Sequence, residues 1–98
     1  MRVLIRAHLN VDASNLSIRE GTLGPLLQKV FAVARPEATY FCVDSGRRTV
    51  LAIADISPEM IPQIAEPMFH DLSADLAFIP VMTGQELEAG LEAWAKQG

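Results

Sequence analysis

An alternation of apolar and other side chains in residues 3–11, VLIRAHLNV, constrains the fold of this chain more than any other feature. A period of two is typical of a β-strand with one buried face, because successive side chains point to opposite faces of the sheet. One face carries Val3, Ile5, Ala7 and Leu9, and the other carries Leu4, Arg6, His8 and Asn10. The first face is predicted to be buried, so the surroundings of the second become the main functional question.

Helical patterns follow this first strand. Asp12, Ser14 and Asn15 are candidate N-caps. Apolar residues in the range 23–34 then recur at helical spacing, and Pro25 suits a position in the first turn. We therefore expect either a short lead-in helix followed by a longer one, or a single helix that bends at Pro25.

Three further strands are predicted from β-branched, aromatic and apolar residues: 38–43 (ATYFCV), 49–56 (TVLAIADI) and 74–81 (ADLAFIPV). The first two are separated by DSGRR, in which Gly46 can supply the positive φ angle of a short turn. These two strands are therefore predicted to form an antiparallel hairpin.

Two further helices are predicted in the second half of the chain. Ser57 is the expected N-cap of the first, whose apolar stripe is interrupted by Pro62 and Pro67. Thr83 and Glu86 have the spacing of a capping box ahead of the last helix. The order of elements is thus β-α-β-β-α-β with an extra C-terminal helix.

This order predicts an α+β protein with a ferredoxin-like antiparallel sheet, formed by a single domain over residues 1–98. The two crossover helices are expected to cover one face of the sheet and to leave the other bare. Apolar side chains from several strands are expected on the bare face, among them some of Leu4, Phe41, Leu51, Ile53, Leu76 and Phe78. A face of this kind is too apolar for water, so a homodimer is predicted.

Composition narrows the classes of partner. The formal net charge is -4, and the eight Lys and Arg residues are scattered along the chain. Binding to nucleic acid or to an anionic membrane needs concentrated positive charge, so neither is expected. No apolar run approaches the roughly 18 residues of a membrane span, and Arg6 and His8 interrupt any leader-like apolar segment.

A single cysteine, Cys42, rules out an internal disulfide and any multi-cysteine metal site. It is predicted to be a small buried apolar residue. Cysteine usage of this kind fits the cytoplasm, and no metal or cofactor is predicted.

Four stretches carry a resemblance to known proteins: EGTLG at 20–24, PEATYF at 36–41, AEPMF at 65–69 and PVMT at 80–83. With the element order and length, they make the chain similar to a family of short uncharacterised bacterial proteins within the dimeric α+β barrel superfamily. The resemblance implies that two ferredoxin-like subunits pack sheet against sheet. In that superfamily ligands usually lie within the barrel or between sheet and helices, and members include cofactor-independent isomerases and monooxygenases.

Arg6 and His8 are the first candidate site residues. They lie on the same face of one strand, about 7 Å apart. Arg6 is predicted to bind a carboxylate or enolate, and His8 to act as acid or base near neutral pH. The alternative is that both are polar interface residues that pair with a carboxylate such as Glu66 or Asp55.

Tyr40 and Asp55 are the second candidate pair. They fall on the two strands of the predicted hairpin, where a phenol beside a carboxylate could orient a carbonyl group. The alternative for Tyr40 is an ordinary amphipathic residue with a solvated hydroxyl group.

Glu66 and His70 lie on the second crossover helix. Glu66 precedes Pro67 and is a candidate base, or else an ordinary solvated residue. His70 is a candidate ligand-binding residue, proton shuttle or axial haem ligand, or else a cation that interacts with the helix C-terminus.

Two functional hypotheses follow. The first is a small cofactor-independent enzyme or binding protein that acts on an anionic or aromatic metabolite in a barrel cavity. The second is a non-catalytic dimeric binding or assembly module. Burying a charged group such as Arg6 beside His8 costs free energy, and a binding or catalytic role would account for that cost. This argument favours the first hypothesis.

Overall fold

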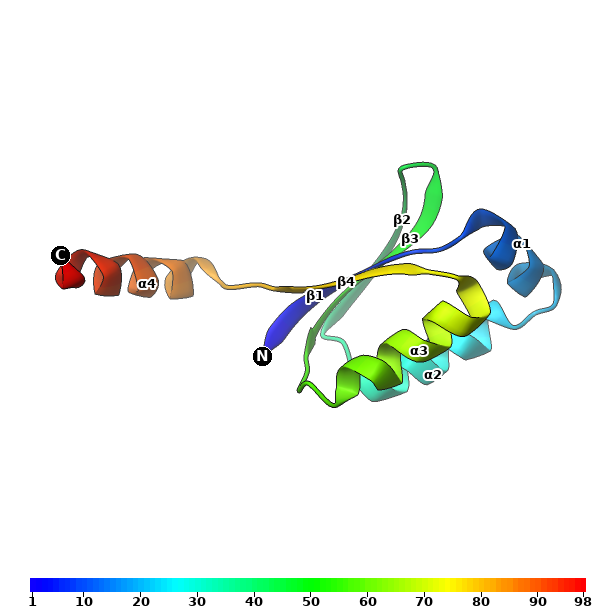
Figure 1. Cartoon of the computed structure of the whole chain (residues 1–98), viewed down its shortest axis with the longest axis horizontal. Helices are drawn as coiled ribbons and strands as arrows, with labels where there is room; N and C mark the ends of the chain where they lie inside the picture. The colour runs from blue at the N-terminus through cyan, green and yellow to red at the C-terminus, as the bar shows by residue number, and fades with distance from the viewer.

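The computed structural model describes all residues from 1 to 98 and shows an α+β architecture (Figure 1). Along the chain the elements are β1 (Arg2–His8), α1 (Val11–Arg19), α2 (Leu23–Ala34), β2 (Ala38–Asp44), β3 (Arg47–Asp55), α3 (Met60–Leu72), β4 (Asp75–Pro80) and α4 (Gly84–Gln97). The four strands form one antiparallel sheet in the order β2-β3-β1-β4. The predicted α+β class and antiparallel hairpin are confirmed.

Helices α2 and α3 pack side by side over one face of the sheet (Figure 1). The alternation in β1 is confirmed, since each residue of its first face is at most 6% exposed. The core between sheet and helices includes Val3, Ile5, Ala7, Val50, Ala52, Ala54, Val30, Ala34, Ile64, Met68 and Leu72. Burial of this apolar surface is the main force that holds the two layers together.

The first crossover contains two helices, which is the first of the two arrangements expected from the sequence. The N-cap of α1 is Asn10, whose side chain accepts a hydrogen bond from the backbone NH of Ala13. The predicted caps at Asp12, Ser14 and Asn15 are therefore wrong. Asn10 was assigned to the preceding strand because it continues the alternation, but the backbone has already left the sheet there.

The hairpin between β2 and β3 closes through Ser45 and Gly46. Their φ angles are 56° and 72°, as a two-residue turn with the twist of a hairpin requires. The turn aligns Asp44 with Arg47 and fixes the register of the whole hairpin.

Helix α3 begins at Met60 rather than directly after Ser57. The Ser57 hydroxyl donates to the side chain of Glu59 at 2.7 Å and does not cap the helix, so that prediction is wrong. Pro62 lies in the first turn, where its lack of an NH is tolerated, and the helix continues through Pro67. The helix is therefore continuous from Met60 to Leu72.

The C-terminal helix α4 projects away from the rest of the molecule (Figure 1). Its predicted capping box is confirmed, with the Thr83 and Glu86 side chains each accepting from the other's backbone NH. None of its residues is buried. Met82 is exposed at the base of this helix.

The second face of the sheet is covered by no helix of the chain, and we call it the open face. By register it carries Leu4, Leu51 and Ile53, as expected. Phe41, Leu76 and Phe78, the other candidates for this face, point to the helix side, where Phe41 meets Phe31. Cys42 lies on the open face and is exposed, so its predicted burial is wrong.

Candidate functional site

The open face is organised in rows, because hydrogen-bonded strands align their residues across the sheet. One row is wholly apolar and crosses all four strands: Ala38, Ile53, Leu4 and Ile79. The next row contains Tyr40, Leu51, Arg6 and Ala77. The third contains Cys42, Thr49, His8 and Asp75. Polarity therefore increases from the apolar row toward the end of the open face that carries His8, and we call this the polar end.

The polar end is held together by a hydrogen bond between His8 and Asp44. The His8 Nε2 atom lies 2.9 Å from the Asp44 Oδ2 atom, although β3 separates their strands. Thr49, on β3, shares the row of His8 and is only 3% exposed. The bridge between His8 and Asp44 therefore crosses β3 at the buried Thr49.

This contact affects the carboxyl group of Asp44. The hydrogen bond from His8 is the main cause that lowers the pKa of Asp44 below its ordinary value, and the charge of Arg6 lowers it further. Only 13% of the His8 side chain is exposed, against 59% for Asp44. A neutral His8 that donates its Nε2 proton to Asp44 keeps Nδ1 as a proton acceptor. The pair can therefore orient an imidazole base.

Arg6 is exposed and lies within 4 Å of no carboxylate. It stands one row from His8 on the same face of β1, as predicted. Its other neighbours across the sheet are Leu51 and Ala77. The open face thus presents an unpaired guanidinium group beside apolar side chains and next to an imidazole.

Tyr40 and Asp55 are not brought together, although both lie on the hairpin. Tyr40 pairs with Leu51, four residues before Asp55, which corresponds to about 13 Å along β3. Tyr40 lies in the row of Arg6, with Leu51 between them. Asp55 instead accepts a hydrogen bond from the Met1 amine at 2.6 Å, which is the main cause that lowers the pKa of Asp55.

Glu66 and His70 are also separate from Arg6 and His8. They lie on α3, whose layer covers the opposite face of the sheet, and both side chains are largely exposed. Their closest atoms are 3.7 Å apart, one helical turn from each other. They therefore form a surface pair and do not supply a carboxylate to Arg6 or His8 within the chain.

Two charged residues that were not among the predicted site residues complete the polar end. Asp44 is the acceptor for His8, and Arg47 lies 4.0 Å from Asp75 at the same end of the sheet. The hairpin sequence DSGRR contains the signal, because a two-residue turn at Ser45 and Gly46 places Asp44 opposite Arg47. That Asp44 reaches a residue of β1, and Arg47 a residue of β4, follows only from the strand order.

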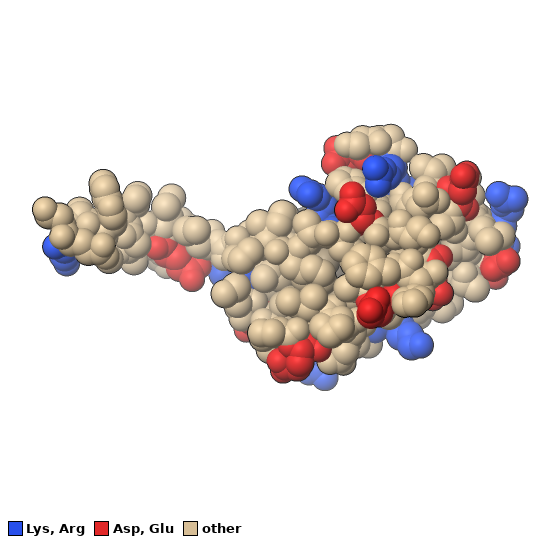
Figure 2. Space-filling model, in the orientation of Figure 1, with Lys and Arg blue, Asp and Glu red and all other residues tan.

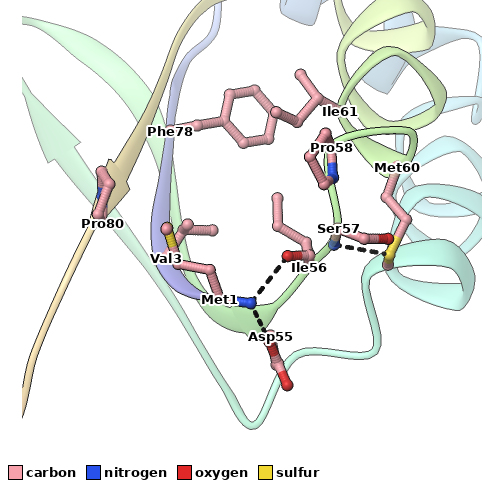
Figure 3. Close-up of a pocket in the computed structure, with 10 residues that line it drawn as sticks. All are labelled: Met1, Val3, Asp55, Ile56, Ser57, Pro58, Met60, Ile61, Phe78 and Pro80. Atoms are coloured by element: carbon pink, nitrogen blue, oxygen red, sulfur yellow. Dashed lines mark hydrogen bonds and ion pairs between the residues drawn. The ribbon is translucent and has the colours of Figure 1, made fainter.

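An apolar concave space lies elsewhere on the chain. A groove of about 540 Å³ opens between the N-terminal end of α3 and the ends of β1 and β4 (Figure 3). Val3, Ile56, Pro58, Met60, Ile61 and Phe78 form most of its apolar wall. No group of three or more His, Cys, Asp or Glu side chains in the chain is arranged to hold a metal ion.

The surface charge is mixed. Figure 2 shows acidic and basic residues interspersed over the visible face of the body, without a continuous basic stripe. None of the helices has the length and apolar character needed to span a membrane.

Comparisons with known proteins add no family to these observations. No protein-family model, no curated protein and no solved structure matches the chain significantly.

Proposed function

We propose that the protein binds a small organic anion, such as an aromatic carboxylate, over the open face of the sheet. The observation that carries this proposal is the unpaired Arg6 beside the hydrogen-bonded His8 and Asp44. A guanidinium group binds a carboxylate through two parallel hydrogen bonds. Leu51 supplies an apolar floor next to Arg6, and Tyr40 bounds that floor on the far side.

His8 gives the site a chemical capacity beyond binding. With Asp44 holding one ring nitrogen, the other is free to take a proton from a bound molecule or return it. The resulting proton transfer, as in a cofactor-independent isomerase, needs neither a metal ion nor an organic cofactor. The proposed reaction class is therefore proton transfer on an anionic substrate.

A second copy of the chain completes this site. None of the cavities of the single chain includes Arg6 or His8, so a ligand there would be covered on one side only. Packing two open faces together would enclose it in a dimeric α+β barrel of ferredoxin-like subunits. The antiparallel sheet with α2 and α3 on one face supports this arrangement, and α1 and α4 are additions to it.

A non-catalytic assembly module is the second candidate function. The row of Ala38, Ile53, Leu4 and Ile79 favours it, because an apolar row across four strands can form a dry interface without a ligand. In that case Arg6 and His8 would lie at the rim of the interface.

Ligand binding is tested by the thermal unfolding of the protein with benzoate and with benzamide, its uncharged analogue. Benzoate should raise the melting temperature, and Arg6→Gln should weaken its binding roughly tenfold or more because a charged hydrogen bond is lost. Lys29→Gln is the matched control, since it removes a cation from the exposed surface of α2. Equal responses to benzoate and benzamide, or equal losses in both variants, would contradict the proposal.

A further inference from the structure

Helix α4 presents an apolar stripe that nothing in the chain covers. Leu87, Leu91 and Trp94 recur at helical spacing on one side, and all three are exposed, Trp94 by 70%. Along α4 the visible charges gather near its base and its C-terminal end, with an uncharged stretch between them (Figure 2). A well-capped amphipathic helix of this kind needs an apolar partner surface.

The start of α4 is fixed in a direction that leads away from its own subunit. The Val81 NH donates to the carbonyl oxygen of Arg2 at 3.2 Å, which extends the edge of the sheet beyond β4. The Arg2 guanidinium group then lies 3.6 Å from Glu86, in the first turn of α4. The helix therefore continues the direction of β4 (Figure 1), and its stripe does not reach the groove of the same chain.

The groove is a suitable receptor for such a stripe. Figure 3 shows the Phe78 ring pointing toward Ile61 at one end of the hollow, with Val3, Ile56 and Pro58 around the rest of it. Its walls are mostly apolar, and its volume of about 540 Å³ exceeds that of a single large side chain. Each chain thus has one helix with an uncovered apolar stripe and one apolar groove.

The area that a stable dimer needs favours a second copy of the chain as the partner of the helix. Two open faces, each of four strands of about seven residues, have a combined projected area on the order of 900 Å², near the roughly 1,200 Å² at the lower limit of a stable interface. Two helices of the length of α4, each in a groove, add about 800 Å². The total then reaches the usual size of a specific dimer.

We propose that α4 of each subunit docks in the groove of the other, so that two copies exchange their C-terminal helices. The exchange rests on the dimer described under the proposed function and extends it to a second contact surface. It is reciprocal, because the same helix and the same groove are used twice about a two-fold axis.

Trp94, the single tryptophan of the chain, reports directly on this contact. Its fluorescence should move to shorter wavelength as protein concentration rises, in parallel with dimer formation in sedimentation experiments. Ile61→Glu places a charge in the groove and should raise the dimer dissociation constant about a hundredfold or more. Ile18→Glu on α1 is the control, since Ile18 and Ile61 are 48% and 37% exposed and only Ile61 lines the groove.

Leu91→Asp tests the helix side of the contact and should have the same effect as Ile61→Glu. Because no residue of α4 is buried, this variant leaves the core intact. The two defects should complement each other in a mixture. The Ile61→Glu chain is mixed with a second chain that carries Leu91→Asp and Trp94→Phe. Trp94 of the first chain should then enter the intact groove of the second chain, and the emission of Trp94 should shift again to shorter wavelength.

Two results would overturn the exchange. In the first, the unmodified protein emits at short wavelength at every concentration and mixing the two variants produces no further shift. This result would show that α4 folds onto its own subunit. Long-wavelength emission at every concentration would show that α4 does not dock at all. If sedimentation still finds a dimer and benzoate binding still depends on Arg6, the proposed function stands without the exchange.

Discussion

The imidazole of His8 on β1 reaches across β3 and meets the carboxylate of Asp44 on β2 at 2.9 Å. Residues 36 positions apart in the chain are thereby joined over the buried hydroxyl group of Thr49. The contact places an oriented imidazole next to Arg6 at one end of the open face. It is the structural basis of the proposed site.

The loss of folding stability at acid pH should depend on the hydrogen bond between His8 and Asp44. The pKa of Asp44 is lower in the folded chain than in the unfolded chain, mainly because of the hydrogen bond from His8. Its contribution to stability is therefore present above the unfolded-state pKa and is lost as pH falls through the folded-state pKa.

The variant His8→Ala, which has no side-chain donor, should accordingly raise the pKa of Asp44 toward its ordinary value, as measured by carboxyl NMR titration. His70→Ala is the matched control, because His70 pairs with Glu66 on the helix layer. An unchanged titration of Asp44 in His8→Ala would mean that the hydrogen bond does not form in solution.

Truncation of a leucine in the core and of a leucine in α4 should have different effects on the free energy of unfolding. Leu72 is fully buried, so Leu72→Ala should lower the free energy of unfolding by about 2–5 kcal/mol. Leu91→Ala on α4 removes the same atoms from an exposed position. Urea unfolding at a concentration where the protein is monomeric should show less than about 0.5 kcal/mol for that change. Similar losses in both variants would mean that α4 packs on the body of its own chain.

The capping box of α4 should control local helix content rather than global stability. Thr83→Ala removes the acceptor for the Glu86 NH and should destabilise the helix by about 1 kcal/mol. Because α4 has no buried residue, the loss should appear as faster amide hydrogen exchange within α4, with little change in the melting temperature. A cooperative loss of the whole fold would contradict this independence.

Two glycines should respond in opposite directions to replacement by alanine. Gly46 has a φ angle of 72°, so Gly46→Ala should destabilise the hairpin by about 1 kcal/mol. Gly90 lies inside α4 with open space around its Cα, and Gly90→Ala should stabilise that helix by about 0.4–1 kcal/mol. Thermal unfolding checks the first variant and amide hydrogen exchange within α4 checks the second, and an unchanged melting temperature in Gly46→Ala would mean that the turn geometry is not as described.

The sequence contained much of the fold because its signals are local. The alternation in β1 predicted which face is buried, and Thr83 with Glu86 predicted the start of α4. Errors arose where a residue fits two neighbouring elements. Asn10 continues the strand pattern but caps α1, and Ser57 precedes a proline but does not cap α3.

The candidate site was less accessible to sequence reasoning because it depends on non-local register. Arg6 and His8 were predicted to share a face from their spacing alone, and they do. The partner of His8 was sought in Glu66 or Asp55, whereas the structure provides Asp44. Which carboxylate meets His8 is fixed by the two-residue turn of the hairpin and by the order of the strands, neither of which follows from the pattern of β1.

The most direct test of the central proposal is an amide NMR titration of the protein with benzoate. Chemical-shift changes should be confined to the open face around Arg6, His8, Tyr40 and Leu51, and they should be lost in Arg6→Gln but kept in Lys29→Gln. Changes that map to the groove around Phe78 and Ile61, or no changes at all, would contradict an anion site on the open face.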